Sequence, residues 1–339
     1  MIKQAIGTLS GILLSAGAAF AQGYEHQPSK GQKPAVEQTE AKSTNMLDDS
    51  YLRKLDFIEG TETEDSEKPL DVLLGLRGTT SSSYSGVSGS AVLSWKPSEK
   101  DDLLSRFRIK GYAGITNETQ EFEESEDLDA LTQAYGFGVR YFTGDKDFSL
   151  AIEPQIFKRD VKYTQGDIDI DRNELSLGAL AALRFGGTHL MFQFAKNVDG
   201  KYDADLGSTN MNGDMERTML YARLSQRLYK DNDQAVYLVL SGRKDHDNFQ
   251  EFFDRDAERA RASLVLDKGN YDLWFAAEYL KSKSHNKISD TDADGERTRI
   301  GPGAGIRLGK NAYLFGEGGA ELTNKKDGGY VTGGLQVRF

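Results

Sequence analysis

The chain has 339 residues, a formal net charge of −11 and 38% hydrophobic residues, which is enough length for one large domain. Its mean hydropathy of −0.57 excludes a bundle of membrane helices but not a barrel of strands, because such strands turn half of their residues toward a polar interior. The absence of cysteine excludes disulfides, thiolate metal sites and cysteine nucleophiles.

Residues 1–21 have the pattern of a secretory signal peptide. Lys3 precedes an apolar stretch over residues 5–20, and small residues at Ala19 and Ala21 form a cleavage site before Gln22. The mature protein is therefore expected to leave the cytoplasm.

Residues 22–69 are polar and acidic, and this composition predicts a mostly disordered periplasmic tail. Within it, apolar residues recur at helical spacing behind an Asn45 cap, so a short amphipathic helix is expected over residues 46–58. The tail is expected to act as a spacer that meets a periplasmic partner. Its acidic residues also suit the alternative, a plug inside a basic barrel.

From Leu70 onward the hydrophobic period changes to two, which is typical of strands. The pattern predicts fourteen strands, each near the roughly 9 to 11 residues that a tilted strand needs to cross a bilayer. They are expected over residues 70–80, 86–96, 103–116, 130–143, 147–160, 173–185, 188–197, 217–229, 234–244, 259–267, 271–282, 297–308, 312–322 and 329–339.

The predicted connections alternate in length along the chain. After each even-numbered strand comes a brief link rich in turn residues, as at 144–146 and 186–187. Most links after odd-numbered strands are long and acidic, namely 117–129, 161–172, 198–216, 245–258 and 283–296. Short periplasmic turns and longer external loops alternate in this way in outer-membrane barrels.

The carboxyl-terminal strand ends on an aromatic residue, with Leu335, Val337 and Phe339 on one face. It resembles the signal that the barrel-assembly machinery recognises in Gram-negative outer-membrane proteins. Residues 70–339 resemble porins and porin-like channels, although no motif identifies a subfamily. The resemblance implies an all-β fold, a transmembrane antiparallel up-and-down barrel, located in the outer membrane against lipid and lipopolysaccharide.

Basic residues dominate the face of each strand opposite to its apolar face. Strand alternation turns the following residues toward the interior: Arg77, Arg106, Arg108, Lys110, Arg140, Arg159, Arg184, Arg223, Arg227, Arg243, Arg261, Arg297, Arg299 and Arg307. The inward acids are fewer. Arginine rings line anion-selective pores, so one interpretation is a path for anions. The other is a ladder of arginine–acid pairs that braces the wall.

No catalytic or metal site is expected. His246 lies between Asp245 and Asp247, which resembles the Asp and His dyad of omptin-like rim proteases, but the spacing departs from that family. Residues 290–295 match the first half of a calcium loop, but Gly301 stands where the loop requires Glu. No cofactor is expected, and the acidic exterior argues against nucleic acid binding.

These features predict passive diffusion of small or oligomeric, anionic solutes through an arginine-lined barrel. One alternative is an export conduit for an acidic polysaccharide. Another is a non-conducting surface barrel or adhesin that acts through its acidic external loops. Long-chain fatty-acid transporters also have fourteen strands, but their Asn-Pro-Ala motif is absent here.

Overall fold

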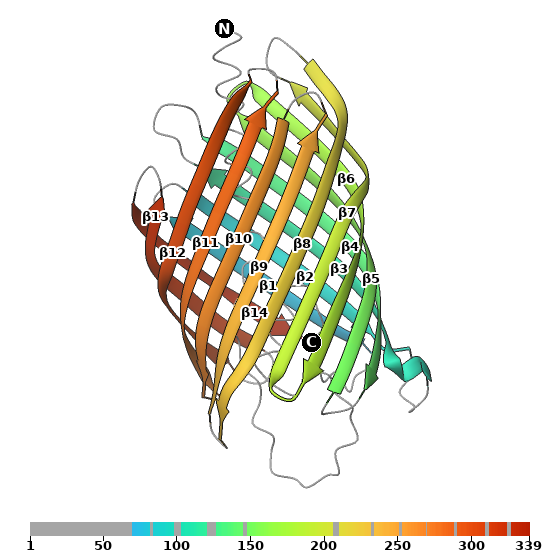
Figure 1. Ribbon diagram of the computed structural model, residues 1–339, viewed down its shortest axis with the longest axis vertical. Helices are drawn as coiled ribbons and strands as arrows, with labels where there is room; N and C mark the ends of the chain where they lie inside the picture. The colour runs from blue at the N-terminus through green and yellow to red at the C-terminus, as the bar shows by residue number, and fades with distance from the viewer. Residues whose placement is uncertain are drawn as a thin grey trace.

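In the part of the chain that it describes, a computed structural model shows fourteen antiparallel strands closed into a barrel (Figure 1). The structure describes residues 70–339 apart from 82–83, 98–102, 121–126, 145–147, 206–209, 232–233, 251–252, 269, 288–289, 309–311 and 324–326. The predicted signal peptide, the tail 22–69 and the helix 46–58 lie outside the described residues. Across the described part of the chain, no helix is long and apolar enough to cross a membrane.

The strands follow one another around the barrel in chain order, and β14 closes on β1 with pairs that run from Leu73 and Arg338 to Ser81 and Tyr330. The strands are β1 (Leu70–Ser81), β2 (Tyr84–Trp95), β3 (Phe107–Gln120), β4 (Leu128–Gly144), β5 (Phe148–Gln165), β6 (Ile168–Phe185), β7 (Thr188–Asp205), β8 (Asn210–Lys230), β9 (Ala235–Phe249), β10 (Phe253–Asp267), β11 (Tyr271–Asn286), β12 (Thr291–Leu308), β13 (Ala312–Thr323) and β14 (Gly328–Arg338).

Alternation along each strand separates an apolar exterior from a mixed interior. In β5, Phe148, Ile152 and Ile156 are exposed, whereas Ala151 and Glu153 are buried. A closed barrel pairs its backbone hydrogen-bonding groups internally and has no open edge, so it can face lipid with such an exterior. The architecture is that of an outer-membrane β-barrel, and the predicted fold and strand number are confirmed.

Aromatic residues stand on the exterior beside the periplasmic turns. Trp95, Phe148, Phe185, Tyr271 and Phe339 are all exposed. Aromatic side chains are enriched where a bilayer meets water, so this band marks the periplasmic interface.

The strands extend much further on the external side than the sequence predicts. The predicted loop 161–172 is a hairpin in which β5 and β6 pair from Phe148 and Phe185 to Gln165 and Ile168. The long β8 (yellow) runs the height of the barrel (Figure 1). Beyond the bilayer the two-residue alternation continues with the opposite polarity, because Val161, Tyr163 and Ile170 are buried inside the barrel while polar residues such as Lys162 and Asp171 face outward. No apolar side chain that the structure describes in this segment faces lipid, so the pattern expected of a membrane-spanning strand ends although the backbone pairing goes on.

The predicted third strand begins too early. Residues Leu103–Arg106 form a 3₁₀ helix, η1, and β3 begins at Phe107. Two consecutive leucines cannot share one face of a strand, whereas the 3₁₀ turn leaves both Leu103 and Leu104 exposed at the periplasmic rim. Arg106 is exposed in this turn, so its predicted position on the interior wall is wrong.

Backbones approach closely where β12 meets β13. A Cβ added to Gly301 would contact the carbonyl oxygen of Gly318 and lie 2.8 Å from the Cα of Gly319. Backbone atoms cannot move aside as a side chain can, so we expect Gly301→Ala to lower the free energy of unfolding by about 1–3 kcal/mol. Urea unfolding in lipid vesicles measures this loss.

Gly242→Ala is the matched control, because its added Cβ would meet no atom closer than 3.8 Å. Equal stabilities of the two variants would contradict the close approach.

Candidate functional site in the barrel interior

A cavity of about 290 Å³ lies inside the barrel. Its wall on β1–β4 consists largely of small residues, including Gly75, Ser90, Gly114 and Ala134. These short side chains leave the interior open on that side. The facing wall, from β5 to β10, carries the arginines Arg159, Arg217, Arg243, Arg259 and Arg261. The cavity therefore has one small-residue face and one cationic face.

Two arginines of the cationic face are directly opposed. Arg243 of β9 and Arg259 of β10 are cross-strand partners, and both line the cavity. Arg243 donates to Asp245 through Nε at 2.6 Å and Nη2 at 2.8 Å, and Arg259 donates through Nη2 to Glu278 at 2.5 Å. Like charges directly opposite each other destabilise a sheet, so this pairing needs the flanking acids or a further anion.

Arg217 contacts several acids on the external side of the Arg243–Arg259 pair. It donates to Glu174 at 3.0 Å and to Asp245 at 2.9 Å, and its Nε lies 3.5 Å from Asp247. Arg217 of β8 thus contacts acids of the neighbouring strand β9 and, across β7, of β6. Arg255 of β10 extends the network with a 3.0 Å hydrogen bond to Asp247.

Asp245 lies above the lipid-facing band, since its neighbours Lys244 and His246 point outward and are exposed. Burial favours the neutral carboxyl, but Arg243 and Arg217 outweigh this effect and hold the pKa of Asp245 well below its usual range. The carboxylate therefore stays ionised and neutralises part of the arginine cluster at neutral pH.

A second cluster bridges strands that are not adjacent. Arg261 of β10 donates to Glu317 of β13 at 2.5 Å, and Trp274 of β11 donates to the same carboxylate at 2.6 Å. The Tyr330 hydroxyl donates to Glu317 at 2.9 Å. A contact from β10 to β13 must pass through the interior, so these side chains face inward.

A third cluster surrounds Glu153 in the periplasmic half. Its carboxylate accepts hydrogen bonds from Arg140 at 2.6 Å, Tyr112 at 2.5 Å and Gln155 at 2.7 Å, and Lys110 Nζ lies 4.0 Å away. Both Glu153 and Lys110 have no exposed surface. Removing one partner from such a cluster would leave a buried charge without its counterpart, which is strongly destabilising.

Strand alternation places most of the predicted basic residues on the inner wall. These are Arg77, Arg108, Lys110, Arg140, Arg159, Arg184, Arg223, Arg227, Arg243, Arg261, Arg297, Arg299 and Arg307. The predicted bracing is present in part, for example where Arg299 donates to Glu321 at 2.6 Å. By the same alternation, inward positions of the described strands carry more Arg and Lys than Asp and Glu.

Four arginines of these clusters were not predicted from the sequence: Arg217, Arg255, Arg259 and Arg172, whose Nη2 lies 3.8 Å from Glu174. They lie in or beside segments that the sequence predicts as external loops. A two-residue period that continues into these segments could have revealed them. In the segment 168–172, for example, Asp169 and Asp171 alternate with the buried residues Ile170 and Arg172.

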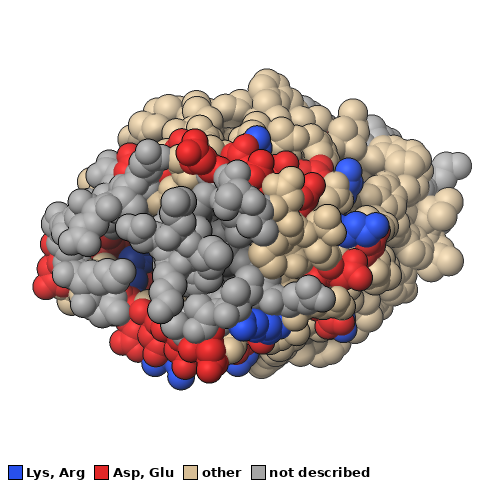
Figure 2. Space-filling view, turned by 90° about the horizontal axis from the view of Figure 1, so that it is seen from above, with Lys and Arg blue, Asp and Glu red and all other residues tan. Residues whose placement is uncertain are grey.

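The external end of the barrel is acidic on its outer surface. Figure 2 shows Asp and Glu gathered around this end, with Lys and Arg between them. Cross-strand pairs recur here: Lys244 donates to Glu258 at 2.8 Å, and Lys281 donates to Glu296 at 2.8 Å. The hydrogen bond and charge of Glu258 raise the pKa of Lys244. The exposed acids of this surface include Asp171, Asp203, Asp214, Glu216, Asp256, Glu258, Asp292 and Asp294.

His246 does not join its sequence neighbours in a dyad. Asp245 and Asp247 face inward, whereas His246 faces outward with its Nδ1 3.1 Å from Asp256. Within the described ranges, no three His, Asp or Glu side chains form a group suited to a metal ion.

No family model matches the chain. No curated protein matches it either. Among solved structures, the chain is similar to the CymD monoaromatic hydrocarbon channel, with 9% identity, a TM-score of 0.48, and coverage of 80% of this chain and 88% of that one. The COG4313 outer membrane channel from Pseudomonas putida F1 gives 12% identity and a TM-score of 0.43, over 80% and 95% of the two chains. The β domain of the Bordetella autotransporter BrkA gives 10% identity and a TM-score of 0.41, over 80% of this chain and 98% of that one.

Proposed function

We propose that this protein is an outer-membrane channel through which small anionic solutes diffuse passively. The observation that carries the proposal is the directly opposed pair Arg243 and Arg259, which lines a cavity inside a closed barrel. A charged constriction selects ions by their sign, and guanidinium groups bind carboxylate, phosphate or sulfate with two parallel hydrogen bonds.

The acids beside the pair support transport rather than tight binding. Asp245 and Glu278 each neutralise part of one guanidinium. A permeating anion must be attracted enough to enter and held weakly enough to leave. Partial neutralisation weakens the binding of an anion at this site while the net charge of the site stays positive.

The size of the cavity favours a small solute over a polymer. Its volume of about 290 Å³ is near the lower end of sites that hold one small molecule. The proposed path therefore fits small organic or inorganic anions better than an acidic polysaccharide. The acidic outer end is proposed to face lipopolysaccharide.

Proteoliposome swelling tests this function. We expect vesicles that contain the protein to swell faster in small monocarboxylates than in ammonium compounds of similar size, because the cationic face attracts the former. Equal rates for anions and cations would contradict an arginine-selected path, and no swelling above protein-free vesicles would contradict a channel.

A further inference from the structure

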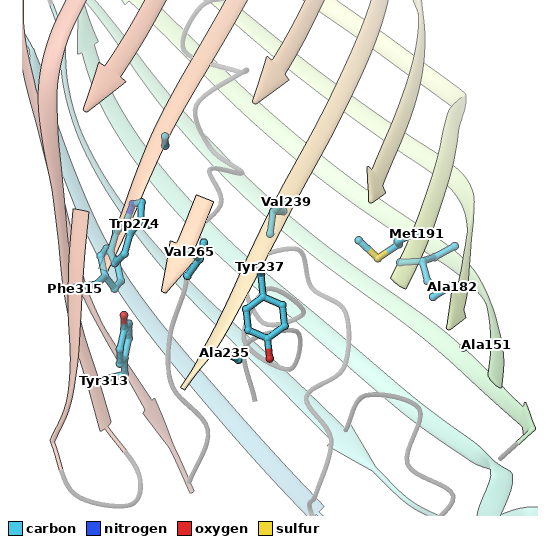
Figure 3. Close-up of a cluster of buried hydrophobic side chains, with 12 residues drawn as sticks. Ala151, Ala182, Met191, Ala235, Tyr237, Val239, Val265, Trp274, Tyr313 and Phe315 are labelled. Carbon is cyan, nitrogen blue, oxygen red and sulfur yellow. The ribbon is translucent and has the colours of Figure 1, made fainter. Parts of the chain in front are cut away.

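An apolar strip runs along the inner wall on the periplasmic side of the arginine face. We define the inner apolar strip by its larger members, several of which are labelled in Figure 3: Leu180, Met191, Val239, Val265, Trp274 and Phe315. Val239 faces inward because its neighbour Leu240 is exposed on the outside, and Val265 faces inward for the same reason beside Leu264. An apolar surface does not attract anions, so the proposed anion path does not explain it.

The side chains of this strip are almost completely buried. Val265, Met191 and Val239 keep 0%, 1% and 2% of their surface exposed. In the sheet, Val265 lies between Tyr237 and Trp274. Tyr237 and Trp274 flank Val265 along the wall. The end of the Val265 side chain points into the barrel, so atoms in the interior must also cover it to keep water away. An apolar surface on the inside of a wide barrel therefore calls for an apolar occupant.

We propose that residues 46–58, the predicted amphipathic helix of the amino-terminal tail, pack against the inner apolar strip. The apolar residues of this segment, Leu47, Tyr51, Leu52, Leu55 and Ile58, recur on one helical face. That face matches the strip in chemical character. The inference does not rest on the proposed anion selectivity, because among the named members of the strip only Phe315 also lines the cavity.

The chain can reach the strip from where it enters the barrel. β1 begins at Leu70, which pairs with Trp95 at the periplasmic end, beside the Phe339 N–H that donates to Val72 at 2.9 Å. Residues 59–69 can span about 37 Å when extended, and the hydrocarbon core of a bilayer is about 30 Å thick. The link is therefore long enough to bring the segment from the periplasmic opening to the strip.

The interior has room for one helix, and its charge fits this one. A helix with its side chains is about 10–12 Å wide, and barrels of only eleven strands enclose a central helix. Fourteen strands can hold a helix and still leave the cavity beside the wall of β1–β4. The segment and its flank carry Asp48, Asp49, Asp56 and Glu59, which complement an interior richer in Arg and Lys than in acids.

Cross-linking tests this packing in the full chain, which has no native cysteine. Single cysteines at Leu47, Tyr51, Leu52, Leu55 and Ile58 are each combined with Val239→Cys and treated with a short bis-maleimide. We expect at least one combination to give an intramolecular cross-link, identified by mass spectrometry of the peptides. The matched control is Leu240→Cys, one residue away but facing the exterior.

Accessibility of the strip provides a second measurement. Val239→Cys in the full chain is expected to react slowly with a membrane-impermeant maleimide, and deletion of residues 22–69 is expected to increase the rate severalfold. Absence of cross-links above the Leu240→Cys control, together with an unchanged labelling rate after deletion, would overturn the proposal. Anion preference measured in the same preparations is a separate result and would still stand or fail by itself.

Discussion

In planar bilayers, the Arg243→Gln/Arg259→Gln double variant is expected to lose most of its preference for anions. Both side chains line the cavity and are cross-strand partners, so the double change removes two adjacent positive charges from the proposed constriction. One charge acting on an ion about 4 Å away in water contributes about 1 kcal/mol, which corresponds to about a fivefold change in ion occupancy. Salt weakens this effect, so the loss is expected to be largest at low ionic strength.

The double variant should still fold, because each acid left behind keeps another arginine. Asp245 accepts a hydrogen bond from Arg217 at 2.9 Å, and Arg261 lies 3.6 Å from Glu278. The matched control is Lys244→Gln/Lys281→Gln, which removes two charges from the outer surface, where both lysines pair with acids. An equal loss of anion preference in both double variants would show that the effect comes from overall charge and not from the cavity.

The largest loss of stability is expected from Glu153→Ala. This change leaves Arg140, Lys110 and Tyr112 around a vacated carboxylate position that has no exposed surface. Removing one partner of a buried ion pair costs about 3–5 kcal/mol, because the remaining charge is left buried without its counterpart. Urea unfolding in lipid vesicles, followed by tryptophan fluorescence, measures the change in the free energy of unfolding.

Asp160→Ala provides the control for Glu153→Ala. Asp160 also pairs with a lysine, Lys158, at 3.6 Å, but this pair lies on the outer surface with about half of the lysine side chain exposed. Exposed pairs contribute about 0–1 kcal/mol. Glu153→Gln, which keeps the shape and part of the hydrogen bonding, is expected to fall between the two. Similar losses for Glu153→Ala and Asp160→Ala would contradict the structural role of the Glu153 cluster.

The two-residue period predicts the barrel well because the bilayer enforces it. Where one face meets lipid and the other meets polar groups, as for Ile156 and Gln155 in β5, the sequence shows which way each side chain points. The inward arginines follow from the same rule. Arg106 does not, because the adjacent leucines of η1 interrupt the alternation.

Other features depend on pairs of residues that are distant in the sequence. The bond from Arg261 to Glu317 joins strands β10 and β13, and no local pattern indicates which acid meets which arginine. The inner apolar strip could not be predicted from the sequence for another reason. The run from Ala235 to Leu240 is apolar on both faces, so alternation does not separate its lipid-facing residues from its inward ones.

The reversal potential of the wild-type channel in a potassium chloride gradient across a planar bilayer tests most directly whether a positively charged path runs through the barrel. We expect a measurable conductance and a reversal potential displaced toward the chloride equilibrium potential. A displacement toward the potassium equilibrium potential, or a membrane that stays silent although the folded protein is inserted, would contradict it.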